Sequence, residues 1–374
     1  MTRMRLRDLG LSIGRLPTGP ANSIADVAGV TVGHATVVAD EPRVVRTGVT
    51  VVHTRGPGDR DQLCYGAMHW LNGNGEMTGS QWLHESGLLA GPIGITNTHQ
   101  VGLVRDELVR WQVDRNPSTE WCLPVVGETW DGHLSDINAF AVTAEHVRAA
   151  LADADSGGPV REGCVGGGTG MVCHEFKGGI GTSSRVATSA GEEWTVGALV
   201  QANYGRRDLL RLDGRRIGHL VGADVVPLAD DPQPEPGAGS IIVILATDAP
   251  LVADQCRRLA QRATVGLARV GGTGSDSSGD IFLAVATGNR VAEGASGRVR
   301  RALPHPAMTP LFEAAAEAVE EAIWNAMCAA ETTVGFAGAP CMPCRWTCCG
   351  RSAAPARRDV HRRRRRRGCR LWPA

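Results

Sequence analysis

The character of the sequence changes within "PEPGAGSIIVILATDAP" (Pro234–Pro250). The first part is rich in Pro and Gly, as loops are, whereas Ser240–Ala246 is almost wholly apolar and is typical of a buried strand. A strand that is apolar on both faces indicates that other layers cover both sides of its sheet. The stretch therefore predicts a layered α/β fold in which Ser240 stands where a loop enters a central strand.

Further strands and helices are expected on both sides of this stretch. Five other runs have the apolar pattern of strands, namely Val30–Asp40, Arg46–Thr54, Cys122–Thr129, Glu193–Asn203 and Asp280–Asn289. Apolar residues recur at helical spacing in Leu251–Ala268 and in the runs that follow Thr143 and Thr309-Pro310. Helices with one apolar face pack on sheets, so we expect helical layers outside sheet layers.

Composition excludes several classes of protein. The chain has 374 residues, 43% of them apolar, and its 39 basic and 39 acidic residues cancel. Eleven of the arginines lie in residues 336–374 beside one acid, Asp359, so the rest of the chain is acidic and gives no reason to expect nucleic-acid binding. The N-terminus lacks the apolar run of a signal peptide, and no segment has the length of a membrane span. With widely spaced cysteines before residue 336, we expect a cytoplasmic protein that binds no membrane.

Residues 336–374 form a tail of different composition, with five Cys and the arginine run Arg362–Arg367. The tail contains the residue types of a zinc site, which are Cys341, Cys344, Cys348, Cys349 and His361. Its arginines have the charge of a patch for nucleic acid or membrane. The abrupt change of composition favours a disordered run instead, and our hypothesis for its origin is a shifted reading frame. We therefore expect one domain over residues 1–335.

Ser240 has no obvious base to activate it. A serine is a weak nucleophile unless a base takes its proton, and neither a G-x-S-x-G motif nor a nearby His accompanies it. Cleavage of the bond between Gly239 and Ser240 would create such a base, because the new α-amine would have a pKa of about 8. Gly239 also tolerates the strained backbone that an acyl shift requires. At this point an ordinary serine at a loop-to-strand junction remains the alternative.

Several ordered blocks show a family resemblance. The stretch "GAGSIIVILATDAPL" resembles the cleavage site of the DmpA-type aminopeptidases, the family of L-aminopeptidase/D-esterases and β-peptidyl aminopeptidases. Further similar blocks are "GPANSIADVAGVTVGHATV" (Gly19–Val37), "NGNGEMTGSQWLHESGLL" (Asn72–Leu89), "ITNTHQVGLVRDE" (Ile95–Glu107), "PVVGETWDGHLSDIN" (Pro124–Asn138), "EGCVGGGTGMVCHEFKGGIGTSSR" (Glu162–Arg185), "VGALVQANYG" (Val196–Gly205) and "GSDSSGDIFLAVATGN" (Gly274–Asn289). The resemblance ends near Gly335, where the tail begins.

The resemblance implies a self-processing hydrolase. It implies that the chain cuts itself before Ser240, which gives an α chain of residues 1–239 and a β chain of residues 240–374. It further implies a four-layer α/β/β/α sandwich, similar to N-terminal-nucleophile hydrolases but differently connected. Members form homo-oligomers, often tetramers, and release N-terminal residues from small peptides, amides or esters without a metal or coenzyme.

Three residues are candidates for the reaction beside Ser240. Ser278 and Asp280 are spaced i, i+2 at a strand start, so they point to the same side and are suited to orient the Ser240 amine. Turns also use these residue types, but the family places a Ser and an acidic residue in this role. Asn203 ends an apolar strand, where it is either a turn residue or, as the resemblance implies, a donor to the oxyanion.

Four residues are candidates for the substrate pocket. Trp130 departs from the Tyr that well-known members carry, and an indole cannot accept a proton, so we expect it to shape the pocket. Glu128, Asp131 and Glu76 are candidates for binding the ammonium group of the substrate, although acidic residues beside turns are more often simply solvated.

The sequence also bears on other functions. The run "VGGGTGMVCHEFKGG" (Val165–Gly179) fits neither a dinucleotide fingerprint nor a P-loop, so it predicts a close-packed loop near the active site. One rival enzyme is an acyltransferase of the ornithine acetyltransferase type, although those carry Thr at the junction. The other alternative is a non-catalytic homologue that stays unprocessed.

Overall fold

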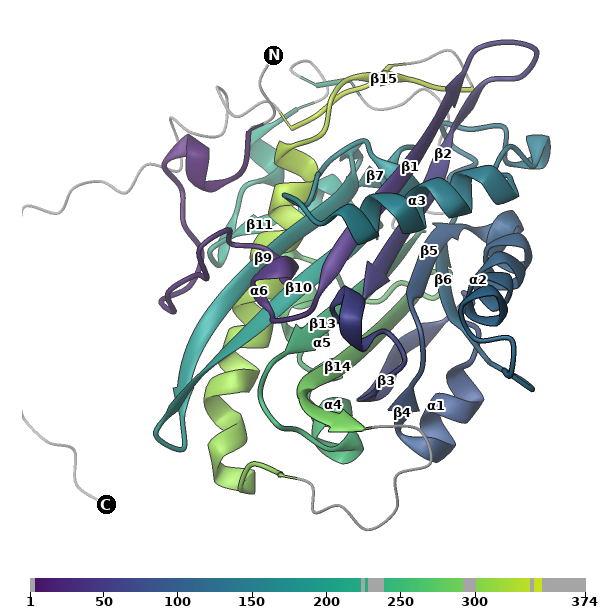
Figure 1. The fold of residues 1–374 in the computed structure, drawn as a ribbon. Helices are drawn as coiled ribbons and strands as arrows, with labels where there is room; N and C mark the ends of the chain where they lie inside the picture. Colours follow the sequence, from purple (N-terminus) through teal and green to yellow (C-terminus); the bar gives the residue numbers. More distant parts are fainter. Residues whose placement is uncertain (1–3, 223–225, 228–238, 292–300, 337–339, 345–374) are drawn as a thin grey trace, which may run out of the picture.

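The computed structural model describes residues 4–222, 226–227, 239–291, 301–336 and 340–344. Two facing β-sheets form its centre (Figure 1). The first sheet has the strand order β1 (Thr31–Ala39), β2 (Val45–His53), β5 (Ile93–Asn97) and β6 (Val125–Thr129). The second has the order β4 (Leu88–Leu89), β3 (Leu63–Gly73), β14 (Gly279–Val291), β13 (Ser240–Thr247), β10 (Glu192–Asn203) and β9 (Gly179–Ser189). The pairs β5–β6 and β13–β14 are parallel and the other pairs are antiparallel.

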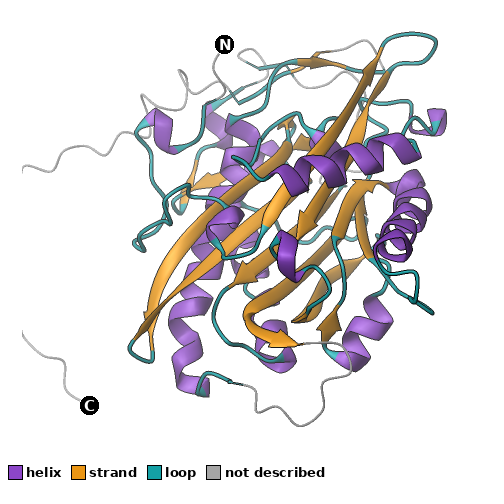
Figure 2. Cartoon of the chain, in the orientation of Figure 1, coloured by secondary structure: helices purple, strands orange, loops and turns teal. Residues whose placement is uncertain are grey.

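Helices cover the outer face of each sheet (Figure 2). The first sheet carries α2 (Val101–Arg115) and α3 (Ala144–Ser156), and the second carries α4 (Ala253–Ala260), α5 (Ala263–Val270) and α6 (Thr309–Cys328). The short helix α1 (Ser80–Ser86) lies beside β3. Short ribbons complete the described elements: β7 (Val172–Cys173) with β8 (Phe176–Lys177), β11 (Arg211–Leu212) with β12 (Arg215–Arg216), and β15 (Thr333–Val334) with β16 (Pro340–Cys341). The expected α/β/β/α order of layers is confirmed.

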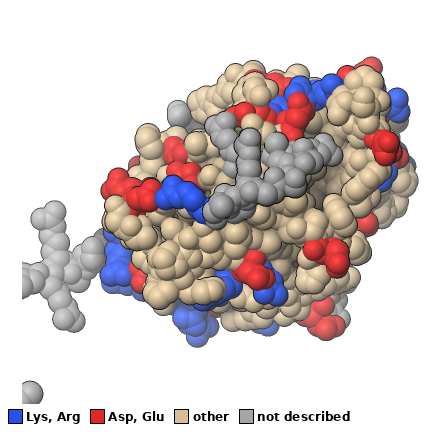
Figure 3. Space-filling model, turned by 60° about the horizontal axis from the view of Figure 1, so that its bottom comes forward, with Lys and Arg blue, Asp and Glu red and all other residues tan. Residues whose placement is uncertain are grey.

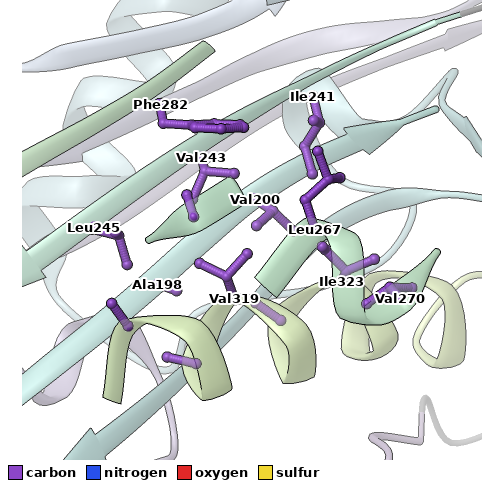
Figure 4. Close-up of a cluster of buried hydrophobic side chains, with 14 of the residues drawn as sticks. Ala198, Val200, Ile241, Val243, Leu245, Leu267, Val270, Phe282, Val319 and Ile323 are labelled. Carbon is purple, nitrogen blue, oxygen red and sulfur yellow. The ribbon is translucent and has the colours of Figure 1, made fainter. Parts of the chain in front are cut away.

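Strand β13 is buried on both faces, as its apolar run predicts. Ile242 and Ile244 lie in the core between the two sheets. The alternate residues Ile241, Val243 and Leu245 point to the outer face, toward α5 and α6 (Figure 4). The contribution of β13 to both cores matches its place inside the sheet, between β10 and β14.

The expectation of a single helix over Leu251–Ala268 is wrong. The structure has two helices there, α4 and α5. Helix α4 packs on β3 and β14, whereas α5 packs on α6. At Gly266 an added Cβ would lie 2.6 Å from Cβ of Val319, so α5 follows the surface of α6 closely. Two different packing partners require two axes, and the chain turns between them at Gln261–Arg262.

The packed chain continues beyond the expected domain boundary at residue 335. Cys341 and Cys344 are buried, and the backbone N–H of Lys177 donates to the carbonyl of Met342 at 2.8 Å. The remaining tail residues, Cys348, Cys349, His361 and Arg362–Arg367 among them, lie outside the described residues, as does most of the linker 229–239. In the described ranges, no group of three or more His, Cys, Asp or Glu side chains is placed to hold a metal ion.

The surface has mixed charge. Acidic and basic side chains are interspersed on the face that Figure 3 shows. None of the helices in the described part of the chain is long and apolar enough to cross a membrane.

Candidate active site

The junction of Gly239 and Ser240 lies at one end of the six-stranded sheet. Strand β13 begins there between β10 and β14, with Ser240 opposite Asn203 on β10 and opposite Gly279 on β14. Ser278 and Asp280 flank Gly279 in the chain. The strand register therefore brings all four candidate reaction residues to the same end of these three neighbouring strands.

The backbone at Gly239 leaves no room for a side chain. Its φ is +146°, and an added Cβ would lie 2.1 Å from the carbonyl oxygen of Asn203. The carbonyl of Gly239 accepts a hydrogen bond from the N–H of Gly279 at 3.1 Å. Only glycine fits this approach of two strands, and the peptide bond before Ser240 is held with its carbonyl polarised by a neighbouring donor.

Ser278 and Asp280 form a buried pair. The Ser278 hydroxyl donates to Oδ1 of Asp280 at 2.7 Å, and both residues are buried. Burial raises the pKa of Asp280 to about 6, and the hydrogen bond from Ser278 offsets part of that rise. Asp280 is in register with Ile241, which faces the helices. Since side chains alternate along a strand, the pair lies on the opposite face of the sheet from the Ser240 side chain.

Asn203 lies on the same sheet face as Ser240, because the two residues are register partners. Its Oδ1 accepts the N–H of Val172 at 2.8 Å, and its Nδ2 donates to the carbonyl of Trp130 at 2.9 Å. These two bonds fix the orientation of the amide. A primary amide carries two N–H groups, so the second N–H of Asn203 is available for an oxyanion.

A buried carboxylate of the facing sheet approaches the Ser240 end of β13 through Gly75. Glu128, on β6, accepts the backbone N–H of Glu76 at 2.9 Å and the hydroxyl of Thr98. An added Cβ on Gly75 would lie 3.0 Å from Oε1 of Glu128 and 3.3 Å from Cα of Gly279, which is the strand partner of Ser240. Burial raises the pKa of Glu128. The site thus combines a serine, an oriented amide and a carboxylate that a cation would stabilise.

The other three pocket candidates occupy different environments. Trp130 is 39% exposed and its indole covers Gly132, where an added Cβ would lie 2.4 Å from the ring. The Glu76 side chain is exposed, and its backbone rather than its carboxylate contacts Glu128. Asp131 is fully buried, and burial raises its pKa to about 7. Of the three acids, Glu128 therefore has the position that best suits an ammonium group.

Comparison with known proteins assigns the family. Residues 22–341 match peptidase family S58. The chain belongs to peptidase family S58. It is 45% identical over 350 residues to the β-peptidyl aminopeptidase of Sphingosinicella microcystinivorans, an alignment that covers 89% of this chain and 88% of the relative.

Two solved structures extend the S58 assignment to the fold. A β-aminopeptidase from Burkholderia sp. is 50% identical, with a TM-score of 0.83 and coverage of 91% of this chain and 95% of that chain. The L-aminopeptidase D-Ala-esterase/amidase of Ochrobactrum anthropi, a prototype for the serine aminopeptidases with a variant of the Ntn-hydrolase fold, is 42% identical, with a TM-score of 0.86 and coverage of 92% and 96%. This S58 member therefore has that fold and is a self-processing serine aminopeptidase.

The S58 site also depends on residues that sequence reasoning did not single out. Thr98 donates to Glu128, Gly75 leaves room for that carboxylate, and the Val172 N–H orients Asn203. The buried Lys177 ammonium donates to the carbonyls of Met171 and Gly178 at 2.9 and 3.0 Å, which braces the loop before Val172. The glycine-rich run was the one available signal, and the glycines of that loop do pack closely: an added Cβ on Gly168 would lie 2.4 Å from a backbone nitrogen.

Proposed function

We propose that this S58 peptidase releases N-terminal residues with a free amino group from small peptides, amides and esters, through an acyl-enzyme on Ser240. The observation that carries the proposal is the position of Glu128: its carboxylate lies against Gly75, and Gly75 in turn lies against Gly279, the strand partner of Ser240. A substrate ammonium bound at Glu128 places the carbonyl of its first residue within reach of Ser240.

Self-cleavage produces the active form in this proposal. The Ser240 hydroxyl attacks the carbonyl of Gly239. The C–N bond between the two residues breaks as an ester to the Ser240 oxygen forms, and the nitrogen takes the hydroxyl proton and becomes the free α-amine of Ser240. Water then hydrolyses that ester, which leaves residues 1–239 as the α chain, with a new carboxylate on Gly239, and restores the Ser240 hydroxyl at the start of the β chain. The N–H of Gly279 supports this step because it already donates to the Gly239 carbonyl.

Turnover uses the freed amine as the base. The Ser240 amine takes the hydroxyl proton as the oxygen attacks the substrate carbonyl, and the second N–H of Asn203 stabilises the oxyanion. Asp280, with Ser278 bonded to it, stabilises the resulting ammonium. The proton passes to the leaving amine or alcohol, and water then releases the acyl group from Ser240.

The relatives suggest which residues are released. The Sphingosinicella and Burkholderia relatives are named for β-peptidyl and β-aminopeptidase activity, so we include N-terminal β-amino acids among the substrates. Trp130 supports a pocket wall rather than an acid–base role, since its indole is partly exposed and lies over Gly132.

The proposal is tested by comparing free and blocked amines. We expect the p-nitroanilides of L-alanine and β-alanine to be hydrolysed, and their N-acetyl derivatives to be inert. Glu128→Gln should lower kcat/KM for the free amines by about 10- to 100-fold, mainly through KM, because a neutral amide replaces a charge-assisted contact. Glu76→Gln, which changes an exposed carboxylate nearby, should remain within about threefold. Equal hydrolysis of acetylated substrates, or an unaffected Glu128→Gln enzyme, would contradict the proposal.

We also propose that the enzyme is a homo-oligomer, with a tetramer as the expected form. Exposed apolar residues support this: the rings of Trp82 and Trp121 are 5.5 Å apart, and with Leu123 they border a cavity of about 450 Å³. Exposed apolar clusters commonly mark protein interfaces. Light scattering during size-exclusion chromatography should give a mass near four times 39.4 kDa, whereas the mass of one protomer would refute the oligomer.

A further inference from the structure

A small cavity with a partly polar lining lies beside the Ser278–Asp280 pair. It is lined by the start of β14, by the segment after β10 that begins at Tyr204, and by the loop 271–275. Its volume is about 10 Å³, which is close to the space that one water molecule needs. The hydroxyl of Tyr204 is buried and has no hydrogen-bond partner among the described residues. A buried hydroxyl without a partner is costly, and Tyr204 is one of the residues that line this cavity.

The Tyr204 ring is held by packing on both sides. Its neighbour in the chain, Asn203, faces the other sheet, so alternation places Tyr204 on the helix side with Asp280. One contact is the edge of His174, with ring centroids 5.0 Å apart. The other is Gly272, where an added Cβ would lie 2.8 Å from Cε2 of Tyr204. Packing therefore fixes the ring beside Ser278 and Asp280.

The titratable groups near the cavity differ in charge near pH 7. Burial raises the pKa of Cys173 to about 12 and lowers the pKa of His174 to about 4, so both are neutral near pH 7. Burial, with Cys173 and Asp280 nearby, raises the pKa of Tyr204 above its usual value, so its hydroxyl keeps its proton. Arg206 also lines the cavity, and its guanidinium pairs with Asp208 at 3.0 Å. The loop 271–275 contributes no titratable side chain, and Asp276 beyond it is exposed.

We propose that Tyr204 is a positioning residue for the reaction: its hydroxyl donates, through one water in this cavity, to Asp280 and holds that carboxylate ionised and directed at the Ser240 amine. The inference rests on the proposed function, because it concerns the group that supports the catalytic amine. Desolvation disfavours the anionic form of Asp280 and raises its pKa. A hydrogen bond donated to the carboxylate favours the anion and lowers that pKa. Water-mediated hydrogen bonds perform this role nearly as well as direct ones.

The test is the pH dependence of Tyr204→Phe, which keeps the ring and removes the hydroxyl. Asp280 must be ionised to act, so loss of a donor should move the lower acid limb of kcat/KM, which lies below the limb of the Ser240 amine, to higher pH by about one unit. Activity on the plateau should fall by less than about tenfold. The chain has two tyrosines, so Tyr65→Phe is a matched control and should leave the limb in place. An active Tyr204→Phe enzyme with an unshifted limb would overturn the inference, whereas inactivity of the wild type would instead refute the proposed function.

A second measurement applies even if Tyr204→Phe fails to fold or to process. In a Tyr65→Phe chain labelled with 3-fluorotyrosine, Tyr204 carries the only fluorine. Its ¹⁹F resonance should shift with pH with a midpoint near that of Asp280, and the shift should be lost when Asp280→Asn is added. Adding Ser240→Ala allows the same measurement on the uncleaved chain. A resonance that is constant between pH 4 and pH 8 in the protein that retains Asp280 would also overturn the inference.

Discussion

Ser240→Ala should remain a single chain of 39.4 kDa and should lack aminopeptidase activity. The substitution removes the nucleophile for self-cleavage and, because the bond before residue 240 stays intact, it also denies the enzyme its α-amine base. Loss of a catalytic serine elsewhere costs about 10⁶-fold in kcat, so we expect a loss of at least about 10⁵-fold. Denaturing electrophoresis over time, with intact mass and N-terminal sequencing, measures the first effect, and p-nitroanilide hydrolysis measures the second.

Ser240→Thr is the matched control, because it keeps a hydroxyl at the same position. It should process more slowly than the wild type, since its extra methyl enters a buried position, and should yield a β chain that begins at residue 240. Two chains in the alanine variant would exclude self-cleavage by Ser240. A wild-type chain that stays uncut while hydrolysing substrate would show that the free amine is not the base.

Local apolar runs were sufficient to predict most central strands. Strand β13 is apolar at both odd and even positions, and it occupies the middle of the second sheet with a core on each side. The family resemblance added the layers and pointed to Ser278, Asp280 and Asn203. Strand pairing determines which face of the sheet each of these residues lies on, and it joins Ser240 to Asn203 and Gly279, which are distant in the sequence. That pairing cannot be predicted from local sequence patterns.

Strand β9 shows why other elements escaped prediction. Its residues, "GIGTSSRVATS" (Gly179–Ser189), lack an apolar pattern, although most are buried. Small side chains are required because α6 lies directly on the strand: an added Cβ on Gly181 would be 2.0 Å from the carbonyl oxygen of Ala322. The buried hydroxyl of Ser183 donates to the carbonyl of Ala318 at 2.6 Å. Close helix-on-strand packing thus replaced hydrophobic periodicity, which is the signal that sequence reasoning uses.

The position of Glu128 was beyond local reasoning for a related reason. Its two donors, Thr98 and the backbone of Glu76, come from different connections of the fold. Sequence chemistry offered Glu128, Asp131 and Glu76 as equivalent acids. Burial and contacts separate them, because Asp131 is enclosed and the Glu76 side chain is exposed.

Asp280→Asn should lower kcat by about 10²- to 10³-fold, which is in the range for loss of one electrostatic contact to a charged transition state. In the wild type, activity should rise with pH as Asp280 ionises, and its pKa is about 6 in the uncleaved chain. The new ammonium of Ser240 lowers that pKa after cleavage, since an opposite charge favours the anion. Two groups should therefore shape the acid side of the profile in the processed enzyme: the Ser240 amine, which must lose its proton to act as base, and Asp280, whose limb should lie below pH 6. Only the lower limb should be absent from Asp280→Asn, and its persistence in that variant would assign it to another group.

The same substitution should stabilise the uncleaved chain. Because the pKa of Asp280 is raised from 3.8 to about 6 by folding, the folded state holds its proton more tightly. The stability that this provides is fully present below pH 3.8 and is lost as pH rises through 6. In the Ser240→Ala background, Asp280→Asn should therefore raise the melting temperature by a few degrees at pH 8 and have little effect near pH 4. The exposed Asp276→Asn should change neither value, and a lower melting temperature for Asp280→Asn at pH 8 would contradict the argument. The ionised Asp280 thus destabilises the precursor, and it gains an opposite charge only when cleavage creates the Ser240 ammonium. Its role beside that amine explains why the chain carries a buried carboxylate there.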